Sequence, residues 1–261
     1  MRKRRNKGKK LITFHNSYLI LALCFILTGY YLNLVVFTSL IIVHEFGHYI
    51  MAKFLHFNIE GIVIYPYGGI TKINDLINRD INEELLVATA GIITQYLFYL
   101  LISFLYTKSY IRDYVFNLYT LYNSRMIFFN LLPIYPLDGS KIIGLLFNKI
   151  FNYNLSNKLI ILLSLITIFI ILFLNVYELN YSNIIIYLIL GSYVYDFVKK
   201  RKYLYNKFLL ERYLYDIKYS KVKVIDNFNN MYKNKTHVIY SNNKYIGEFQ
   251  ILKKIFSHKT S

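Results

Sequence analysis

The sequence has little cysteine, little proline and few charged residues. Its single cysteine, Cys24, excludes a disulfide within one chain and lies in an apolar stretch, as a packing residue would. Only 17% of the 261 residues are charged, whereas 56% are hydrophobic, a composition that ordinary soluble domains do not have. No small-residue cleavage site follows Thr28, so we interpret the first apolar stretch as a retained span and not as a signal peptide. These absences favour an integral membrane protein.

Long apolar runs predict a polytopic α-helical membrane protein with about six transmembrane helices. A bilayer-spanning helix needs about 20 predominantly apolar residues. The expected spans cover residues 11–28, 31–55, 83–106, 115–132, 155–176 and 182–198. The turn around Gly29 is very short, so the first two spans should form an antiparallel pair.

The net charge of +17 is distributed unevenly along the chain. Basic residues gather in residues 1–10 and again from Lys199, whereas the loop "TKSYIRD" holds only Lys108 and Arg112. The positive-inside rule then predicts a multi-pass protein with both termini in the cytoplasm. The basic flanks also predict contact with anionic lipids. No fold signature indicates nucleic-acid binding.

Three segments follow from this pattern: a membrane-embedded domain over residues 1–200, a basic linker helix over 201–218 and a small α/β module over 219–261. The module should run strand, helix, strand, turn, strand, helix. It is too small to bury a sizeable core alone, so we expect it to need a partner.

A short β-hairpin is predicted between the second and third spans, in "HFNIEGIVIYPYGGITKIND". We place it on the cytoplasmic side, where it could dip into the membrane as a re-entrant element. Gly68 and Gly69 leave an edge without side-chain obstruction, to which an extended peptide could add as a further strand. An ordinary hairpin loop is the alternative.

The segment "HEFGH" places His44, Glu45 and His48 inside an apolar run. Two histidines four residues apart share one helix face, which suits two ligands of one metal ion. Glu45 can hold an attacking water and take its proton. Gly47 keeps the helix surface low, which could leave room for substrate. Ionisable groups inside a membrane span are costly and usually functional; the alternative is a polar cluster that bridges helices.

A catalytic zinc ion usually takes three protein ligands, so a third ligand should lie elsewhere. Asp138, in "FNLLPIYPLDGSK", fits best because it follows the fourth span at its cytoplasmic end. Pro133 and Pro136 immediately precede it and fix the loop geometry. The alternative is that Asp138 is the N-cap of a helix that begins at Gly139.

With these two motifs in order, the chain resembles the site-2 protease family of intramembrane zinc metalloproteases. The resemblance implies one Zn²⁺ per chain, with His44, His48 and Asp138 as ligands and Glu45 as the catalytic base. It also implies that residues of the "NLLPIYPLDG" motif contact the substrate. These residues are Asn130 and Pro136.

Two further segments carry the resemblance with departures. "YPYGGI" is similar to the family's Pro-Phe-Gly-Gly hairpin, with Tyr67 in place of Phe. "ATAGIITQ" is similar to its Ala-Gly-Pro-x-x-Asn element, with Ile92 replacing Pro and Gln95 replacing Asn. The catalytic set is intact.

Six spans and a carboxy-terminal module resemble the stage IV sporulation protein FB branch, whose members process a sigma-factor precursor. The module itself resembles one CBS unit, with Gln250 and Lys253 at positions where nucleotide contacts are usual, which weakens the case for ATP binding. Since CBS units pair, the resemblance implies a homo-dimer or higher oligomer formed through this module, or docking of the module onto substrate.

We therefore predict an intramembrane zinc endopeptidase that cleaves a membrane-associated precursor at the cytoplasmic face, with regulatory membrane proteins as further partners. One alternative is an inactive relative that binds and sequesters membrane proteins, against which the intact Glu45 argues. A metal transporter is the second alternative. The near absence of polar residues from the last two spans argues against it.

Overall fold

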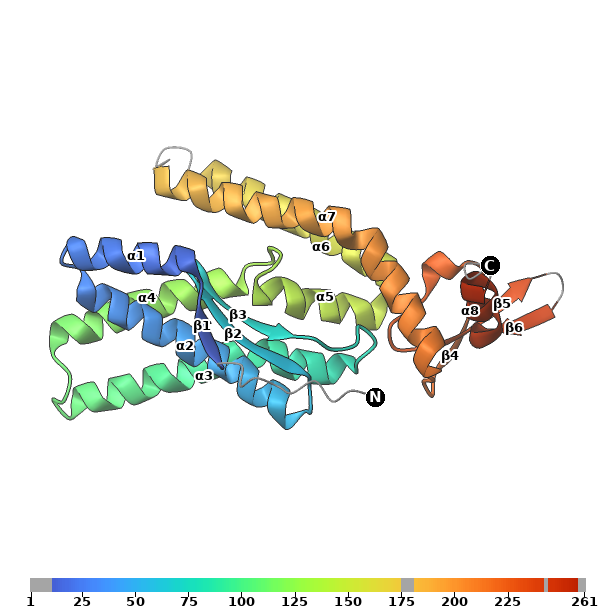
Figure 1. The fold of residues 1–261 in the computed structure, drawn as a ribbon, viewed down its shortest axis with the longest axis horizontal. Helices are drawn as coiled ribbons and strands as arrows, with labels where there is room; N and C mark the ends of the chain where they lie inside the picture. The colour runs from blue at the N-terminus through green and yellow to red at the C-terminus, as the bar shows by residue number, and fades with distance from the viewer. Residues whose placement is uncertain (1–10, 175–180, 242–243, 258–261) are drawn as a thin grey trace, which may run out of the picture. The chain divides into compact units, whose positions relative to one another are not determined.

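The structure, a computed structural model, describes residues 11–174, 181–241 and 244–257 (Figure 1). The basic cluster of residues 1–10 and the loop residues 175–180 lie outside the described residues. The chain forms two compact units. The first comprises Met1–Asp75 and Leu86–Asn130, and the second comprises Leu76–Leu85 and Leu131–Ser261.

Helices make up most of the first unit. They are α1 (Asn16–Leu27), α2 (Tyr31–Phe54), the larger part of α3 (Ile81–Thr107) and α4 (Asp113–Leu131). Gly29 joins α1 to α2 with φ +78°, a backbone conformation that glycine adopts readily, so the expected tight turn is present. Val36 and Leu40 of α2 pack with Leu118 of α4 in one buried cluster.

A three-stranded sheet covers part of α2. Its strands are β1 (Ile12–Phe14), β2 (Ile59–Tyr65) and β3 (Gly68–Ile73), in the order β1-β2-β3. The antiparallel pair β2–β3 is the predicted hairpin, and Tyr65 pairs with Gly68 across its turn. Ile62 and Ile64 bury their side chains against Ile41 of α2.

Strand β1 corrects the expected first span. Residues 11–28 were predicted to be one helix, but Ile12–Phe14 pair with β2 in parallel, and His15 then caps α1 by accepting a hydrogen bond from the Ser17 N–H. The β-branched and aromatic side chains of this segment suit a strand. The remaining 12-residue helix is about 18 Å long, well short of a bilayer core of about 30 Å.

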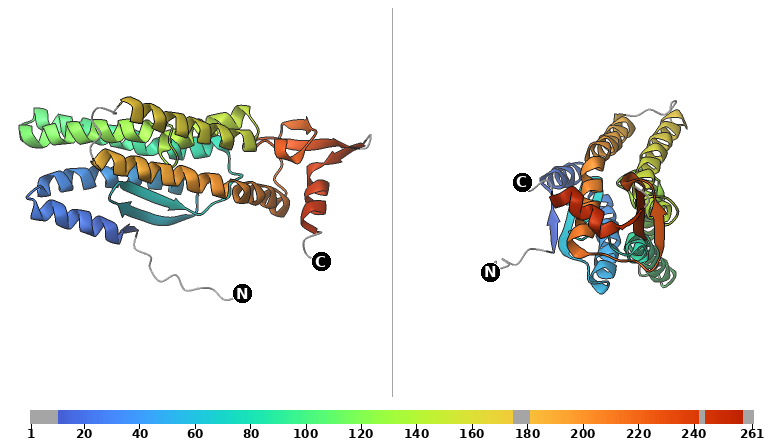
Figure 2. Two further views of the ribbon diagram at one scale, coloured as in Figure 1. Left: turned by 90° about the horizontal axis from the view of Figure 1, so that it is seen from above. Right: turned by 90° about the vertical axis from the view of Figure 1, so that its right-hand side faces the viewer.

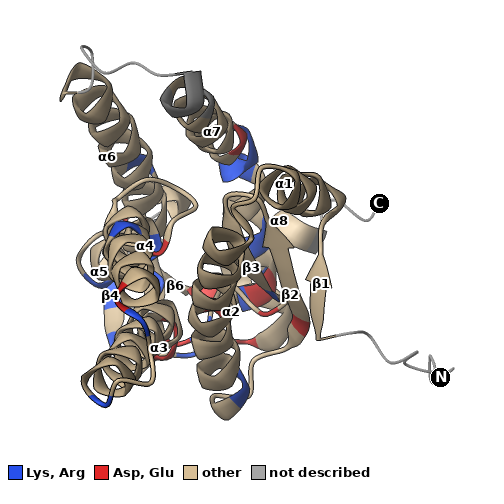
Figure 3. Cartoon of the chain, turned by 90° about the vertical axis from the view of Figure 1, so that its left-hand side faces the viewer, with Lys and Arg blue, Asp and Glu red and all other residues tan. Residues whose placement is uncertain are grey.

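Among the described residues, three helices are long and apolar enough to cross a membrane. They are α2, α3 and α6 (Tyr153–Leu174), which coincide with the second, third and fifth predicted spans. The protein is therefore mostly helical with apolar spanning helices, as predicted, but the count of six spans is not confirmed. Figure 3 colours the charged residues, which are nearly absent from α1 and α2. The charged residues of these two helices are Lys53, in the last turn of α2, and Glu45, whose buried position in the middle of α2 points to a site.

The second unit contains α5 (Asp138–Ile150), α6 and α7 (Tyr181–Tyr215). Helices α6 and α7 lie side by side (Figure 2). The 35-residue α7 runs without a break through both the predicted sixth span and most of the predicted linker helix. Its sequence after Gly191 contains neither glycine nor proline, so nothing ends the helix near residue 200.

The carboxy-terminal module follows α7 in the order that the sequence predicted. Its elements are β4 (Val222–Ile225), the 3-10 turn η2 (Phe228–Asn230), β5 (Thr236–Ser241), β6 (Lys244–Gly247) and α8 (Glu248–Ser257). The first helix is only the three-residue η2. Strand β5 is central, parallel to β4 and antiparallel to β6.

The module buries its core against α7 of the same chain. Phe208 and Leu209 of α7 share one buried cluster with Ile239 of β5 and Leu252 of α8. This intrachain surface supplies the partner that so small a module was expected to need. Resemblance to a CBS unit and pairing between two chains stay predictions.

Candidate metal centre

His44, Glu45 and His48 form a buried cluster on α2. Their side chains are 2%, 5% and 6% exposed, and their potential ligand atoms lie within 4.8 Å of one another. The i, i+4 spacing places both imidazoles on one helix face, with 3.1 Å between the two Nε2 atoms. The structure thus brings together the three residues of the "HEFGH" segment.

Both histidines are held by carbonyl oxygens from α3. The Nδ1 atom of His44 lies 3.0 Å from Oε1 of Gln95, and that of His48 lies 2.7 Å from the backbone oxygen of Val87. A carbonyl oxygen only accepts, so each Nδ1 carries the hydrogen and each Nε2 carries the lone pair. This tautomer is the one that presents Nε2 to a metal.

The spacing of the two Nε2 atoms fits a metal ion. Two ligands about 2.0–2.1 Å from a tetrahedral zinc ion are separated by about 3.3 Å, close to the distance seen here. Two lone pairs that face each other at 3.1 Å repel unless a cation or proton lies between them. The donor set and its geometry therefore suit zinc.

Glycines allow α3 to approach the histidines. A Cβ atom on Gly91 would lie 2.3 Å from Nε2 of His48, and one on Gly47 would lie 2.0 Å from Oγ1 of Thr94. Gly47 therefore accommodates α3. The prediction that Gly47 leaves room for substrate is wrong, because a packed helix occupies that side of α2.

Glu45 lies under strand β3 of the hairpin. Thr71 donates to its Oε2 at 2.7 Å, and the Thr71 hydroxyl also lies 3.2 Å from the Glu45 backbone oxygen. A Cβ atom on Gly69 would come within 2.2 Å of Glu45 Cγ. Gly69 is thus the residue type that lets the strand lie directly on this carboxylate.

Asp138 belongs to the second unit, where it is the first residue of α5 and only 4% exposed. The N-cap is Leu137, so the alternative that Asp138 is the N-cap is wrong. Nζ of Lys141 lies 2.8 Å from Asp138 Oδ1. A Cβ atom on Gly139 would collide with the backbone of Leu131 at 2.2 Å, which explains glycine at that position. The role of Asp138 as third ligand stays a prediction.

The four residues predicted to bind substrate lie in both units. Gly68 and Gly69 begin β3 in the first unit, Asn130 ends that unit, and Pro136 precedes α5 in the second. Gly68 has φ +145°, with open space where a Cβ atom would lie. Their contacts with a substrate stay predictions.

Sequence reasoning did not assign the residues that hold the cluster. Gln95 appeared only as a departure from a motif, and Thr71 and Asn123 were not singled out at all. The one available signal was polarity in apolar segments, since Gln95 and Asn123 are 0% and 5% exposed.

Comparisons with known proteins agree with this geometry. Residues 32–111 match the model of a family described as "Peptidase family M50". The chain is 31% identical over 204 residues to "Stage IV sporulation protein FB" of Bacillus subtilis (strain 168), covering 77% of this chain and 71% of that protein. Its fold is similar to that of "Site-2 Protease from Methanocaldococcus jannaschii". That match has a TM-score of 0.55 at 21% identity and covers 71% of this chain and 89% of the other.

Proposed function

Because this chain belongs to peptidase family M50, the site-2 proteases, and is a membrane metalloprotease, we propose that it is a zinc endopeptidase cleaving a membrane-associated protein. The observation that carries this proposal is the pair of Nε2 atoms 3.1 Å apart beside the buried Glu45. We assign the zinc ligands to His44, His48 and Asp138.

Glu45 is the general base of the proposed reaction. Thr71 binds its Oε2, so we assign proton transfer to Oε1. A zinc ion at this site supplies Lewis-acid activation of water and of the scissile carbonyl. Glu45 takes the proton of the attacking water and returns it to the leaving amine. Burial of the cluster in α2 keeps bulk water away from these steps.

Strand β3 is the proposed docking edge for substrate. A helical peptide hides its carbonyls in backbone hydrogen bonds, so a transmembrane substrate must unwind before it is cleaved. In the described part of the first sheet, β3 pairs with β2 alone and lies at the edge of the order β1-β2-β3. A peptide added there as a fourth strand would run past Gly69, directly above Glu45.

We further propose a role in sporulation, with a sigma-factor precursor as substrate and cleavage at the cytoplasmic face. The support is the similarity to a stage IV sporulation protein together with the basic loops that predict cytoplasmic termini. The simplest test of this role is to compare expression of the protein in sporulating and in vegetative cells. We expect expression only in sporulating cells, and equal expression in both would argue against the role.

Glu45→Gln tests the mechanism, because glutamine keeps an oxygen for the Thr71 hydroxyl but cannot take a proton. We expect zinc content equal to that of the wild type, and cleavage of a co-expressed precursor lower by about 10²–10⁴-fold. Metal analysis of the purified protein and immunoblots of the precursor measure the two. Unchanged cleavage would rule out Glu45 as the base.

Asp138→Asn tests the third ligand. Loss of a charged ligand should lower the zinc content of the purified protein, with the fold retained. Full zinc retention would reduce Asp138 to a residue that favours the start of α5 through its charge near the helix N-terminus.

A further inference from the structure

We propose that Gln95, oriented by Asn123, is a positioning residue that fixes the tautomer of His44 for metal binding. The inference rests on the proposed metal site and extends it to a chain of hydrogen bonds from Asn123 through the Gln95 amide to His44. This chain, called the relay below, connects three helices of the first unit. His44 lies on α2, Gln95 on α3 and Asn123 on α4.

The relay is fully buried. Gln95 is 0% exposed and Asn123 is 5% exposed. Oε1 of Gln95 accepts from Nδ1 of His44 at 3.0 Å, while its Nε2 donates to Oδ1 of Asn123 at 3.1 Å and faces the Asn123 backbone oxygen at 3.4 Å. Buried amides without partners are costly, so these hydrogen bonds hold the side chains in place.

Asn123 decides which way the Gln95 amide points. Two oxygens of Asn123 face the NH₂ group of Gln95, so the carbonyl of Gln95 is turned toward His44. In the opposite orientation an N–H would face Nδ1 of His44, which would move the imidazole hydrogen to Nε2. The Nε2–H of His44 would then point toward His48. It would occupy the space of the metal ion and leave Nε2 without the lone pair that binds metal.

The second histidine does not depend on a side chain in this way. His48 donates to the backbone oxygen of Val87, and side-chain substitution does not remove that acceptor. The two ligands are thus held differently, and His44 is the one whose tautomer a substitution in α3 or α4 can release.

Metal titration of the full-length protein in detergent tests the relay. The apoprotein is titrated with Co²⁺, whose visible absorption reports the ligand environment, and with Zn²⁺ in competition. Gln95→Leu should weaken binding about 10- to 100-fold and alter the Co²⁺ spectrum. Gln95→Glu keeps an acceptor for Nδ1, and the Asn123 amide can turn its NH₂ group toward the second carboxylate oxygen, so this variant should recover most of the affinity that Gln95→Leu loses. Asn123→Leu should weaken binding less than Gln95→Leu.

Tyr99→Phe is the matched control, because it removes another polar contact between α3 and α4, the 3.2 Å bond from Tyr99 to Thr120, away from His44. It should bind Co²⁺ like the wild type. Three results would each overturn the relay. Gln95→Leu could bind Co²⁺ with wild-type affinity, or Tyr99→Phe could lose as much affinity as Gln95→Leu. The third is that Gln95→Glu binds no more tightly than Gln95→Leu. His44→Ala separates the two proposals: if it binds metal like the wild type, the metal site itself is wrong.

Discussion

Each polar group of the "HEFGH" segment has a specific partner from another element. Gln95 faces His44, the Val87 carbonyl faces His48 and Thr71 faces Glu45. Polar groups buried without hydrogen bonds destabilise a protein, so these partners explain how α2 tolerates the segment in an apolar environment. They also hold the side chains before metal or substrate arrives, which is what a preorganised site requires.

Gly91→Ala should disrupt metal binding, because its Cβ atom would lie 2.3 Å from Nε2 of His48. We expect metal affinity to fall at least about 10-fold, as for lost ligand support, with overpacking costing about 1–3 kcal/mol of stability. Zinc analysis and thermal unfolding measure the two effects. Gly191→Ala on α7 is the control, since its Cβ atom would meet open space. Equal metal content in both variants would contradict the geometry.

The sequence predicted the cluster of His44, Glu45 and His48 but not the residues that surround it. His44 and His48 are visible because their i, i+4 spacing is local. Gln95 lies 51 positions from His44, and Thr71 lies 26 positions from Glu45, so only the tertiary fold brings them together. Gly47 was misinterpreted for the same reason: a glycine creates a flat helix surface, and the sequence alone does not say whether a helix or a substrate covers it.

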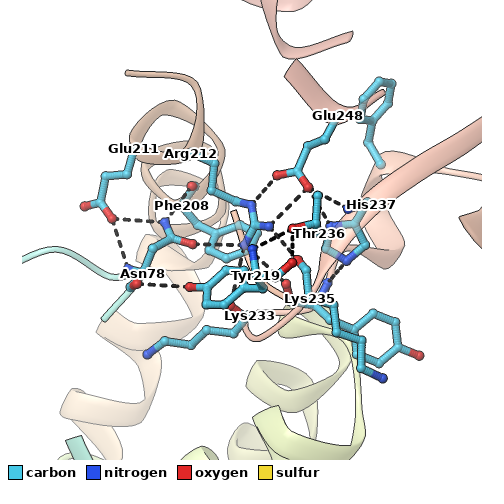
Figure 4. A network of polar contacts seen from close by, with 12 residues as sticks. Asn78, Phe208, Glu211, Arg212, Tyr219, Lys233, Lys235, Thr236, His237 and Glu248 are labelled. Atoms are coloured by element: carbon cyan, nitrogen blue, oxygen red, sulfur yellow. Dashed lines mark hydrogen bonds and ion pairs between the residues drawn. The ribbon is translucent and has the colours of Figure 1, made fainter. Parts of the chain in front are cut away.

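At the scale of elements, the end of α7 is fixed to the carboxy-terminal module by buried polar contacts (Figure 4). Arg212 is 2% exposed, forms an ion pair with Glu248 and donates to the backbone oxygen of Lys235 at 2.6 Å. Asn78 donates to Glu211 and to the backbone oxygen of Phe208. Removing one partner of a buried ion pair usually lowers the free energy of unfolding by about 3–5 kcal/mol. Because separating the module from α7 would break this pair, we expect α7 and the module to unfold together.

His237 in β5 makes this network sensitive to pH. Its Nδ1 donates to Glu248, and its Nε2 accepts from the Tyr232 N–H at 2.9 Å, so the folded module needs neutral imidazole. Burial lowers the pKa of His237 below 6.5, helped by the charges of Arg212 and Lys235 and opposed by the Glu248 carboxylate. Burial alone would raise the pKa of Glu248, but His237 and Arg212 bring it below 4.5.

Acidification should therefore destabilise the second unit. Below pH 6.5 the unfolded chain binds a proton at His237 that the folded module does not, so the free energy of unfolding falls, by at most about 1.4 kcal/mol per pH unit for one group. Glu248 adds to the loss below pH 4.5. Thermal unfolding in detergent between pH 7.5 and 5.5 measures the first effect. In His237→Asn the new side chain does not titrate, so the free energy of unfolding should lose most of this pH dependence. If the variant keeps the pH dependence of the wild type, other groups cause it.

At the scale of the molecule, the fold class could be predicted because apolar runs, the hairpin turn and the element order of the module are local patterns. Three predicted spans coincide with helices that can cross a membrane. Strand β1 was missed because its paired residues in β2 are 50 positions away and its apolar residues are equally typical of the start of a helix. The packing of the module on α7 was missed because the partly amphipathic pattern of residues 201–215 does not say which surface covers its apolar side.

The number of spans is open to a direct test with cysteine labelling. Cys24 is the only cysteine, so Cys24→Ser gives a background without thiols. Ser109→Cys, Lys149→Cys and Ser220→Cys then place single exposed thiols after α3, at the end of α5 and after α7. A membrane-impermeant maleimide, applied to intact and to permeabilised cells, reports the side of each thiol.

Labelling at the three positions distinguishes a topology with six spans from a topology in which only α2, α3 and α6 cross the membrane. With six spans and basic loops inside, Lys149→Cys and Ser220→Cys should label only after permeabilisation, and Ser109→Cys in intact cells. If α4 and α7 do not cross, Lys149→Cys labels with Ser109→Cys instead. Lys141 remains near the start of α5 in this variant, so the segment that carries the thiol keeps a basic residue and its charge still favours the cytoplasm. The fourth span is thus decisive, since only if it crosses does α5, which begins at Asp138, lie on the cytoplasmic side with the hairpin.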